Sequence, residues 1–122
     1  MANNAKKRLG AEGEAAVAQY LLQNNCTILQ KNYSIRAGEV DIIFKEHDTI
    51  VFAEVKTRSS TRFGSPAEAV TKTKQQRMAQ VALHYMAQNG TEESLRFDVM
   101  EVFAANGGFT ISHIKNAFYV ES

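Results

Sequence analysis

Two short β-prone runs decide the fold: Gly38-Glu39-Val40-Asp41-Ile42-Ile43-Phe44 and Thr49-Ile50-Val51-Phe52-Ala53-Glu54-Val55-Lys56. The polar residues 45–48 separate them, and this pattern is typical of an antiparallel hairpin. We predict that Phe44 pairs with Thr49, because this register groups the apolar side chains of both strands. It would place Asp41 opposite Phe52 and Glu39 opposite Glu54.

Side chains alternate across a strand, so this register predicts which charged groups meet. Glu39, Asp41, Glu54 and Lys56 should project from one face, with Val40, Ile42 and Phe44 together on the other. The apolar residues before Glu54 also favour a central position for the second strand rather than an edge.

Carboxylates gathered on neighbouring strands repel one another, at a cost on the order of 1 kcal/mol for a directly opposed pair. Lys56 offsets part of this repulsion, and a divalent cation would offset more. Mg²⁺ takes oxygen ligands, commonly one or two protein carboxylates. Asp41 and Glu54 are therefore candidate ligands for Mg²⁺ or Mn²⁺, with Lys56 beside a reacting phosphodiester. From spacing alone, a solvated strand pair with weak ion pairs is an equal alternative.

Composition sets the broad class of the protein. The 122 residues, 44% hydrophobic and 22% charged, predict a single domain spanning residues 1–122. One cysteine, Cys26, excludes an intramolecular disulfide framework and a multi-cysteine zinc site. The sequence has neither an apolar run of membrane-spanning length nor a secretory signal pattern, so we expect a cytoplasmic protein that does not associate with a membrane. It also has no Gly-rich phosphate loop or Rossmann fingerprint, so we expect no small-molecule cofactor.

The overall charge of +1 hides a basic tract. Between residues 56 and 77 the chain carries six basic residues against Glu68 alone, a local charge of +5: Lys56, Arg58, Arg62, Lys72, Lys74 and Arg77. Clustered Lys and Arg attract polyanions such as nucleic acid, although a solvated face gives the same pattern. The charge alone therefore leaves both a nucleic-acid partner and a solvated face open.

The flanking patterns complete the predicted fold. Apolar residues at helical spacing predict a helix from Ala5 to Asn24, and a strand follows near Thr27–Ile35. Ser65, Pro66 and Glu68 form a helix-start signal, so we expect a long helix from there to Asn89. Strands near 95–103 and 109–114 follow. The order αβββαββ predicts an α/β domain with a mixed β-sheet core flanked by helices.

Together, Gly38-Glu39-Val40-Asp41 and Glu54-Val55-Lys56 resemble the Asp…Glu-x-Lys signature of restriction-endonuclease-like nucleases, although Val40 replaces the usual proline. The whole chain resembles the small bacterial YraN family of predicted endonucleases, themselves similar to archaeal Holliday-junction resolvases. Other motifs that support this resemblance are Gly10-x-x-Gly13-Glu14, Asn32-Tyr33, Arg58, Phe63-Gly64-x-Pro66 and Phe97-Asp98-Val99.

The resemblance implies a restriction-endonuclease-like core with Asp41 and Glu54 as metal ligands and Lys56 as the catalytic lysine. It also implies that Glu14, on the first helix, reaches the metal site. The resemblance also favours Gln75 as a residue that contacts phosphate or water.

Other residues add weaker predictions. Lys74 lies within the apolar stripe of its helix, so it either extends to solvent or faces the site. Candidate phosphate contacts are Arg58, Arg62, Lys72, Lys74, Gln75 and Arg77. Asp98 is predicted to be structural, paired with Arg96 or another neighbour.

Three functions fit the sequence. The first is a metal-dependent endonuclease acting on DNA, with branched or junction DNA among its candidate substrates. The second is a nucleic-acid-binding module of the same fold with little or no hydrolytic activity. The third is a protein-interaction domain with an acidic face. Symmetric cutting of two strands would require a homodimer.

Overall fold

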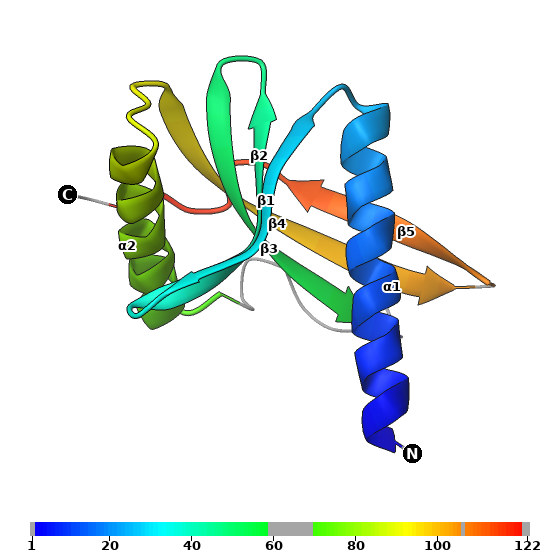
Figure 1. Ribbon diagram of the computed structural model, residues 1–122. Helices are drawn as coiled ribbons and strands as arrows, with labels where there is room; N and C mark the ends of the chain where they lie inside the picture. The colour runs from blue at the N-terminus through cyan, green and yellow to red at the C-terminus, as the bar shows by residue number, and fades with distance from the viewer. Residues whose placement is uncertain (1, 59–69, 106, 121–122) are drawn as a thin grey trace.

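A computed structural model describes residues 2–58, 70–105 and 107–120. It contains a five-stranded sheet in the order β1-β2-β3-β4-β5, with two helices (Figure 1). The elements are α1 (Ala2–Gln23), β1 (Thr27–Ile35), β2 (Gly38–Glu46), β3 (Thr49–Arg58), α2 (Lys72–Gln88), β4 (Ser94–Ala105) and β5 (Gly108–Ile114). The predicted α/β class, mixed sheet and element order are confirmed.

The strand pairing explains why the sheet is mixed. Neighbouring strands are antiparallel except β3 and β4, which run parallel for ten paired residues. Parallel neighbours need a crossover connection, and α2 lies within it. In the strand order of the sheet, β3 is the central strand, as its apolar run predicted.

Two hydrophobic cores cover the two faces of the sheet. On one face, Val17 and Leu21 of α1 pack against β2, β3 and β4. On the other, Met78 and Val81 of α2 pack against the opposite side of the same strands. Figure 1 shows the two helices on opposite sides of the sheet. Both helices thus bury the apolar stripe that their spacing predicted.

The predicted start of the second long helix was wrong. α2 begins at Lys72, and the side chain of its N-cap, Thr71, accepts a hydrogen bond from the Lys74 amide at 3.1 Å. Val70 precedes the helix and is buried. The signal at Ser65, Pro66 and Glu68 lies outside the described residues, as does Arg62. A threonine cap directly before the apolar stripe therefore sets the helix start.

Among the described residues, no helix has the length and apolar character needed to cross a lipid bilayer.

Candidate active site

The β2–β3 hairpin differs in register from our prediction by two residues. Glu46 pairs with Thr49 and Phe44 with Val51, so the turn contains only His47 and Asp48. His47 adopts a positive φ of 54°, a conformation that tight hairpin turns require and that Asn or Gly usually supplies. The predicted pairs Phe44–Thr49, Asp41–Phe52 and Glu39–Glu54 are therefore wrong. The observed ladder ends at Ile42 and Ala53, directly beside Asp41 and Glu54.

The predicted alternation along β2 also fails at Asp41. Ile42 and Phe44 belong to the core beneath α1, whereas Val40 belongs to the core beneath α2. On the neighbouring strand, Asn32 has a positive φ of 51°, between paired residues on each side. This positive φ lies opposite Asp41, the position at which the alternation of β2 breaks.

Asp41 lies where β2 and β3 separate. Its Oδ2 accepts a hydrogen bond from the backbone N–H of Val55 at 2.7 Å. A side-chain carboxylate thus binds the β3 backbone just beyond the last pair of the ladder, Ile42 and Ala53. The local sequence places one carboxylate of the site between two strands rather than on one face of the sheet.

The electrostatic environment of Asp41 opposes its ionisation. Burial is the largest cause, and the neighbouring charge of Glu54 adds to it, so the pKa of Asp41 rises from 3.8 to about 6. The hydrogen bond from Val55 and the charge of Lys74 act in the opposite direction. Two carboxylates in a shielded position are an arrangement that a cation would stabilise.

Glu54 supplies the second carboxylate, on the α2 side of the sheet. Its side chain is 7% exposed and lies between two ammonium groups. Lys56 Nζ is 3.6 Å from Oε1, and Lys74 Nζ is 3.4 Å from Oε2. The second oxygen is buried without a hydrogen-bond partner among the described residues. Of the two alternatives for Lys74, the structure selects the one that faces the site.

Glu14 approaches Asp41 from the α1 side. Gly13 lies so close to β3 that a Cβ there would collide with the side chain of Thr57. This close approach lets Glu14 line a small cleft together with Asp41. Burial, followed by the charge of Asp41, raises the pKa of Glu14. The structure therefore brings the helix acid to the Asp41 side of the site, while its side chain stays exposed.

These residues suit a cation that needs few protein ligands. The described residues contain no group of three or more His, Cys, Asp or Glu placed to hold a metal ion. Mg²⁺ is commonly bound by one or two carboxylates, with water and substrate phosphate completing the octahedron. Asp41 and Glu54 fit that requirement: burial raises the pKa of Asp41, and Oε2 of Glu54 makes no hydrogen bond among the described residues and has only the ionic contact with Lys74.

The predicted phosphate contacts separate into distinct positions. Arg58, at the end of β3, donates from Nε to Oε1 of Glu101 at 2.8 Å. Gln75 donates to the Val70 carbonyl at 3.1 Å. Lys72 and Arg77 are exposed on α2.

Sequence reasoning missed Glu101 as a member of this region. Its side chain is fully buried and holds Arg58, and its second oxygen has no hydrogen-bond partner among the described residues. The sequence signal that could have revealed it is the position of Glu101, two residues after Val99, as the only acid on the otherwise apolar face of an alternating strand. An acid at such a position needs a buried partner. Glu39, by contrast, pairs with Ser34 of β1 and is exposed.

A separate polar cluster lies around Asp98, as the structural interpretation predicted. Asp98 is fully buried and pairs with Arg96 at 2.8 Å and His113 Nε2 at 2.6 Å. It also accepts from the Asn116 amide, and His113 Nδ1 lies 3.0 Å from the Tyr20 hydroxyl. This cluster joins α1, β4, β5 and the following segment, so its role is structural.

Comparisons with known proteins place the chain in a family. The model of the uncharacterised protein family UPF0102 matches residues 13–102, a range that contains Glu14, Asp41, Glu54, Lys56 and Lys74. A UPF0102 protein of Alkaliphilus oremlandii is 46% identical over 115 residues, covering 92% of this chain and 98% of that protein. Relatives from Clostridioides difficile and Nitrosomonas europaea are 43% and 42% identical, over 95% and 89% of this chain and 99% and 92% of theirs. The family resemblance seen in the sequence is thus confirmed: the chain belongs to the uncharacterised protein family UPF0102.

Proposed function

We propose that the protein is a metal-dependent endonuclease that hydrolyses phosphodiester bonds of DNA, with branched or junction DNA among its candidate substrates. The observation that carries the proposal is the pair of shielded carboxylates, Asp41 and Glu54, flanked by Lys56 and Lys74. A fold alone requires no such repelling pair, whereas metal-assisted hydrolysis uses one.

Each residue has a role that follows from its position. Asp41 and Glu54 would hold Mg²⁺ or Mn²⁺, which when bound polarises the phosphate and lowers the pKa of a coordinated water. Lys56 is 40% exposed, so its ammonium can reach a phosphate and offset the charge that develops on phosphorus. Lys74 neutralises Glu54 from α2, and Glu14 adds a carboxylate on the Asp41 side.

The surroundings of the site favour a polyanionic substrate. Arg58 follows Lys56 by two residues and projects to the same side of β3, and Lys72 and Arg77 lie on α2. Cations near a carboxylate pair draw a phosphate backbone toward the site and hold it there. Arg62 stays a predicted contact, and assembly as a homodimer stays a proposal.

A panel of labelled single strand, duplex, flap and four-way junction tests the proposal. Each substrate is incubated with Mg²⁺, Mn²⁺ or EDTA, beside the Asp41→Asn protein. We expect metal-dependent cutting by the wild type and none by the variant. A second readout is thermal unfolding, in which Mg²⁺ should stabilise the wild type but not the variant. Cutting in EDTA, or equal cutting by Asp41→Asn, would overturn the proposal.

The second candidate is a binding module without hydrolytic activity, which the basic residues around the site also favour. Salt-dependent DNA binding without cleavage under any metal would support this module instead.

A further inference from the structure

Glu101 of β4 is fully buried, and one oxygen of its carboxylate lacks a hydrogen bond. Oε1 accepts a bond from Arg58 Nε at 2.8 Å, whereas the buried Oε2 has no hydrogen-bond partner among the described residues. Ser112, which pairs with Glu101 from β5, does not supply one. Leaving a buried carboxylate oxygen unsatisfied costs free energy, so a donor that moved to this oxygen would be stabilised there.

The strand register places Glu101 directly beside Lys56. The two residues are partners in the parallel ladder of β3 and β4, whose strands lie about 4.8 Å apart. Phe52 on β3 and Val99 on β4 belong to the core beneath α2. Side chains alternate along a strand, so Lys56 and Glu101, an even number of residues further on, face the same side. Lys56 therefore has two carboxylate neighbours on one face of the sheet, Glu54 and Glu101.

The contact between Lys56 and Glu54 is loose. Lys56 Nζ lies 3.6 Å from Oε1 of Glu54, beyond the roughly 2.7–2.9 Å of a charge-assisted hydrogen bond. The Lys56 side chain is 40% exposed, and a lysine carries its ammonium on a flexible stem. By comparison, Arg58 Nε lies 2.8 Å from Oε1 of Glu101. The Lys56 ammonium can therefore leave Glu54 at little cost.

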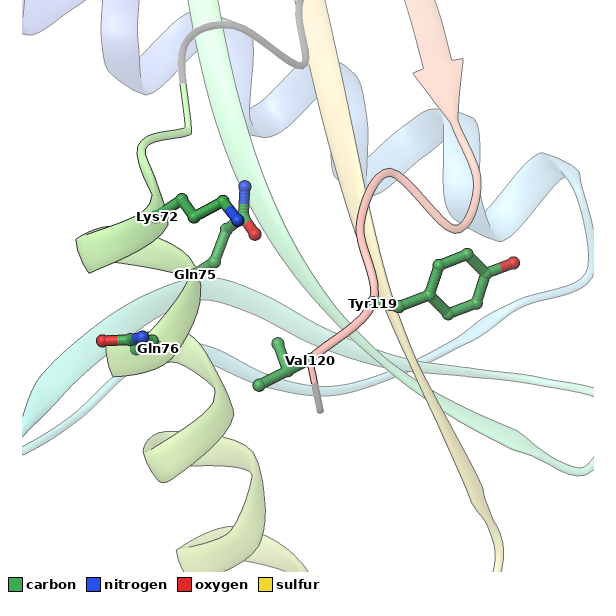
Figure 2. A pocket seen from close by; sticks show the side chains of 5 residues that line it. All are labelled: Lys72, Gln75, Gln76, Tyr119 and Val120. Carbon is green, nitrogen blue, oxygen red and sulfur yellow. The ribbon is translucent and has the colours of Figure 1, made fainter. Parts of the chain in front are cut away.

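The two lysines of α2 are placed differently from Lys56. Lys74 reaches the second oxygen of Glu54, at 3.4 Å. Lys72, two residues earlier, lines a separate pocket of about 350 Å³ between α2 and the segment that follows β5 (Figure 2). Lys56 is therefore the lysine that the strand register places beside the unsatisfied oxygen of Glu101.

We propose that Glu101 is a positioning residue that receives the Lys56 ammonium when a divalent cation binds at Glu54. The inference rests on the cation site of the proposed function. Lys56 exchanges one carboxylate for the other: its ammonium leaves Oε1 of Glu54, which becomes available to the cation, and meets Oε2 of Glu101. The buried oxygen thereby gains the partner that it lacks. Lys56 is also kept on the same face of the sheet as Glu54, where a reacting phosphate would lie, instead of being repelled into solvent.

Binding of Mn²⁺ to the DNA-free protein tests this exchange without relying on cleavage. The electron paramagnetic resonance signal of the free ion measures the affinity. The variants are Glu101→Gln, which keeps an oxygen for Arg58, Lys56→Met, and the two combined, each first shown to unfold cooperatively. Ser112→Ala removes the other polar neighbour of Glu101, and Lys115→Met removes a lysine that pairs with Glu46 instead. These two variants are the controls.

We expect Lys56→Met to tighten Mn²⁺ binding about fivefold, because it removes a unit charge that competes at about 4 Å. Glu101→Gln should weaken binding about fivefold alone but less than twofold beside Lys56→Met, since Lys56 then no longer needs an acceptor. Both controls should stay within twofold of the wild type. A second readout needs no change at Glu101: its carboxyl ¹³C resonance should shift on addition of Mg²⁺ in the wild type and not in Lys56→Met.

The two backgrounds separate this exchange from a direct effect of Glu101 on the cation. Equal weakening by Glu101→Gln with and without Lys56 would overturn the inference. So would looser binding by Lys56→Met, an unmoved Glu101 resonance, or a wild type that binds no Mn²⁺. The coupled effect in a protein that cuts no DNA would uphold the exchange and contradict the nuclease function.

Discussion

Lys74 Nζ lies 3.4 Å from Oε2 of Glu54, so a cation from α2 meets a carboxylate of the central strand. Lys56 Nζ meets the other oxygen at 3.6 Å. The two ammonium groups come from different elements. This arrangement links the packing of α2 against the sheet directly to the charge state of the candidate site.

Lys74→Met should lower the rate constant for cleavage of bound DNA by about 10²–10³-fold, the usual effect of removing one preorganised charge from a site. Lys74→Arg should recover part of that loss. Single-turnover cleavage measures both. Lys72→Met is the matched control on the same helix, and it should weaken binding while leaving the bound rate unchanged. Equal rates for Lys74→Met and Lys72→Met would show that Lys74 has no special role.

The raised pKa of Asp41 predicts how stability depends on pH in the metal-free protein. With a folded pKa of about 6 against 3.8 ordinarily, the folded state binds the proton more tightly than the unfolded chain. Stability should therefore fall as pH rises from about 4 to about 6. Asp41→Asn removes this effect, so in EDTA it should be more stable than the wild type by about 1–3 kcal/mol at pH 8 and equal near pH 4.

Urea denaturation at both pH values measures this difference. Glu39→Gln, an exposed acid on the same strand, is the control and should track the wild type at each pH. A wild type that matches or exceeds Asp41→Asn at pH 8 without metal would contradict the raised pKa.

The Asp98 cluster predicts the opposite pH dependence. Burial acts to raise the pKa of Asp98, but hydrogen bonds from His113 and Arg96 outweigh it and the pKa falls below 3.8. The stability that this carboxylate adds is therefore present above about pH 4 and lost as pH falls further. Asp98→Asn should cost about 3 kcal/mol at pH 7 and much less at pH 3, because Arg96 and His113 lose the buried charge that they share and Arg96 keeps only Glu46 as an ionic partner.

Denaturant unfolding at pH 7 and pH 3 checks the Asp98 prediction. Asp48→Asn, in the exposed hairpin turn, should change stability by less than about 0.5 kcal/mol. A cost for Asp98→Asn that is the same at both pH values would contradict the assignment.

Arg58 and Glu101 should act as one unit in binding DNA. The buried carboxylate holds the guanidinium at 2.8 Å, so Glu101→Gln should weaken binding when Arg58 is present and add little when Arg58 is alanine. Arg58→Ala should also reduce the dependence of log K on log salt by about 0.7–0.9. Lys115→Ala is the control, since Lys115 pairs with Glu46, the last residue of β2, which lies beside the start of β3 and so at the other end of that strand from Arg58. Additive losses from the two substitutions would contradict the coupling.

Much of the fold was predictable because local patterns and tertiary structure agree. The apolar stripe of α1 and the alternation of β4 each match the face that packs. The central position of β3 followed from its apolar run, and the mixed sheet followed from the element order.

The errors have local physical causes. The register was wrong by two residues because His47 takes a left-handed conformation that its residue type does not signal. The start of α2 was wrong because Thr71 caps the helix after a stronger-looking signal at Ser65.

The proximity of Asp41, Glu54 and Lys56 was predictable from the sequence, but the geometry that brings them together was not. Asp41 and Glu54 do come together, yet through a backbone contact with Val55 rather than by facing each other across a regular ladder. The contact between Lys74 and Glu54 depends on how α2 docks, which spacing along one helix cannot define. The partnership of Glu101 with Arg58 joins residues 43 positions apart, and only tertiary structure reveals it.

The most direct test of the central claim compares two acids of β2 in one assay. Single-turnover cleavage of a labelled flap in Mg²⁺ is measured for wild type, Asp41→Asn and Glu39→Gln, after each protein has been shown to fold. The account predicts cleavage by the wild type and Glu39→Gln at rates within a few-fold of each other, and a loss of at least about 10³-fold in Asp41→Asn. Cleavage by Asp41→Asn at the wild-type rate would contradict the claim that Asp41 holds the catalytic metal.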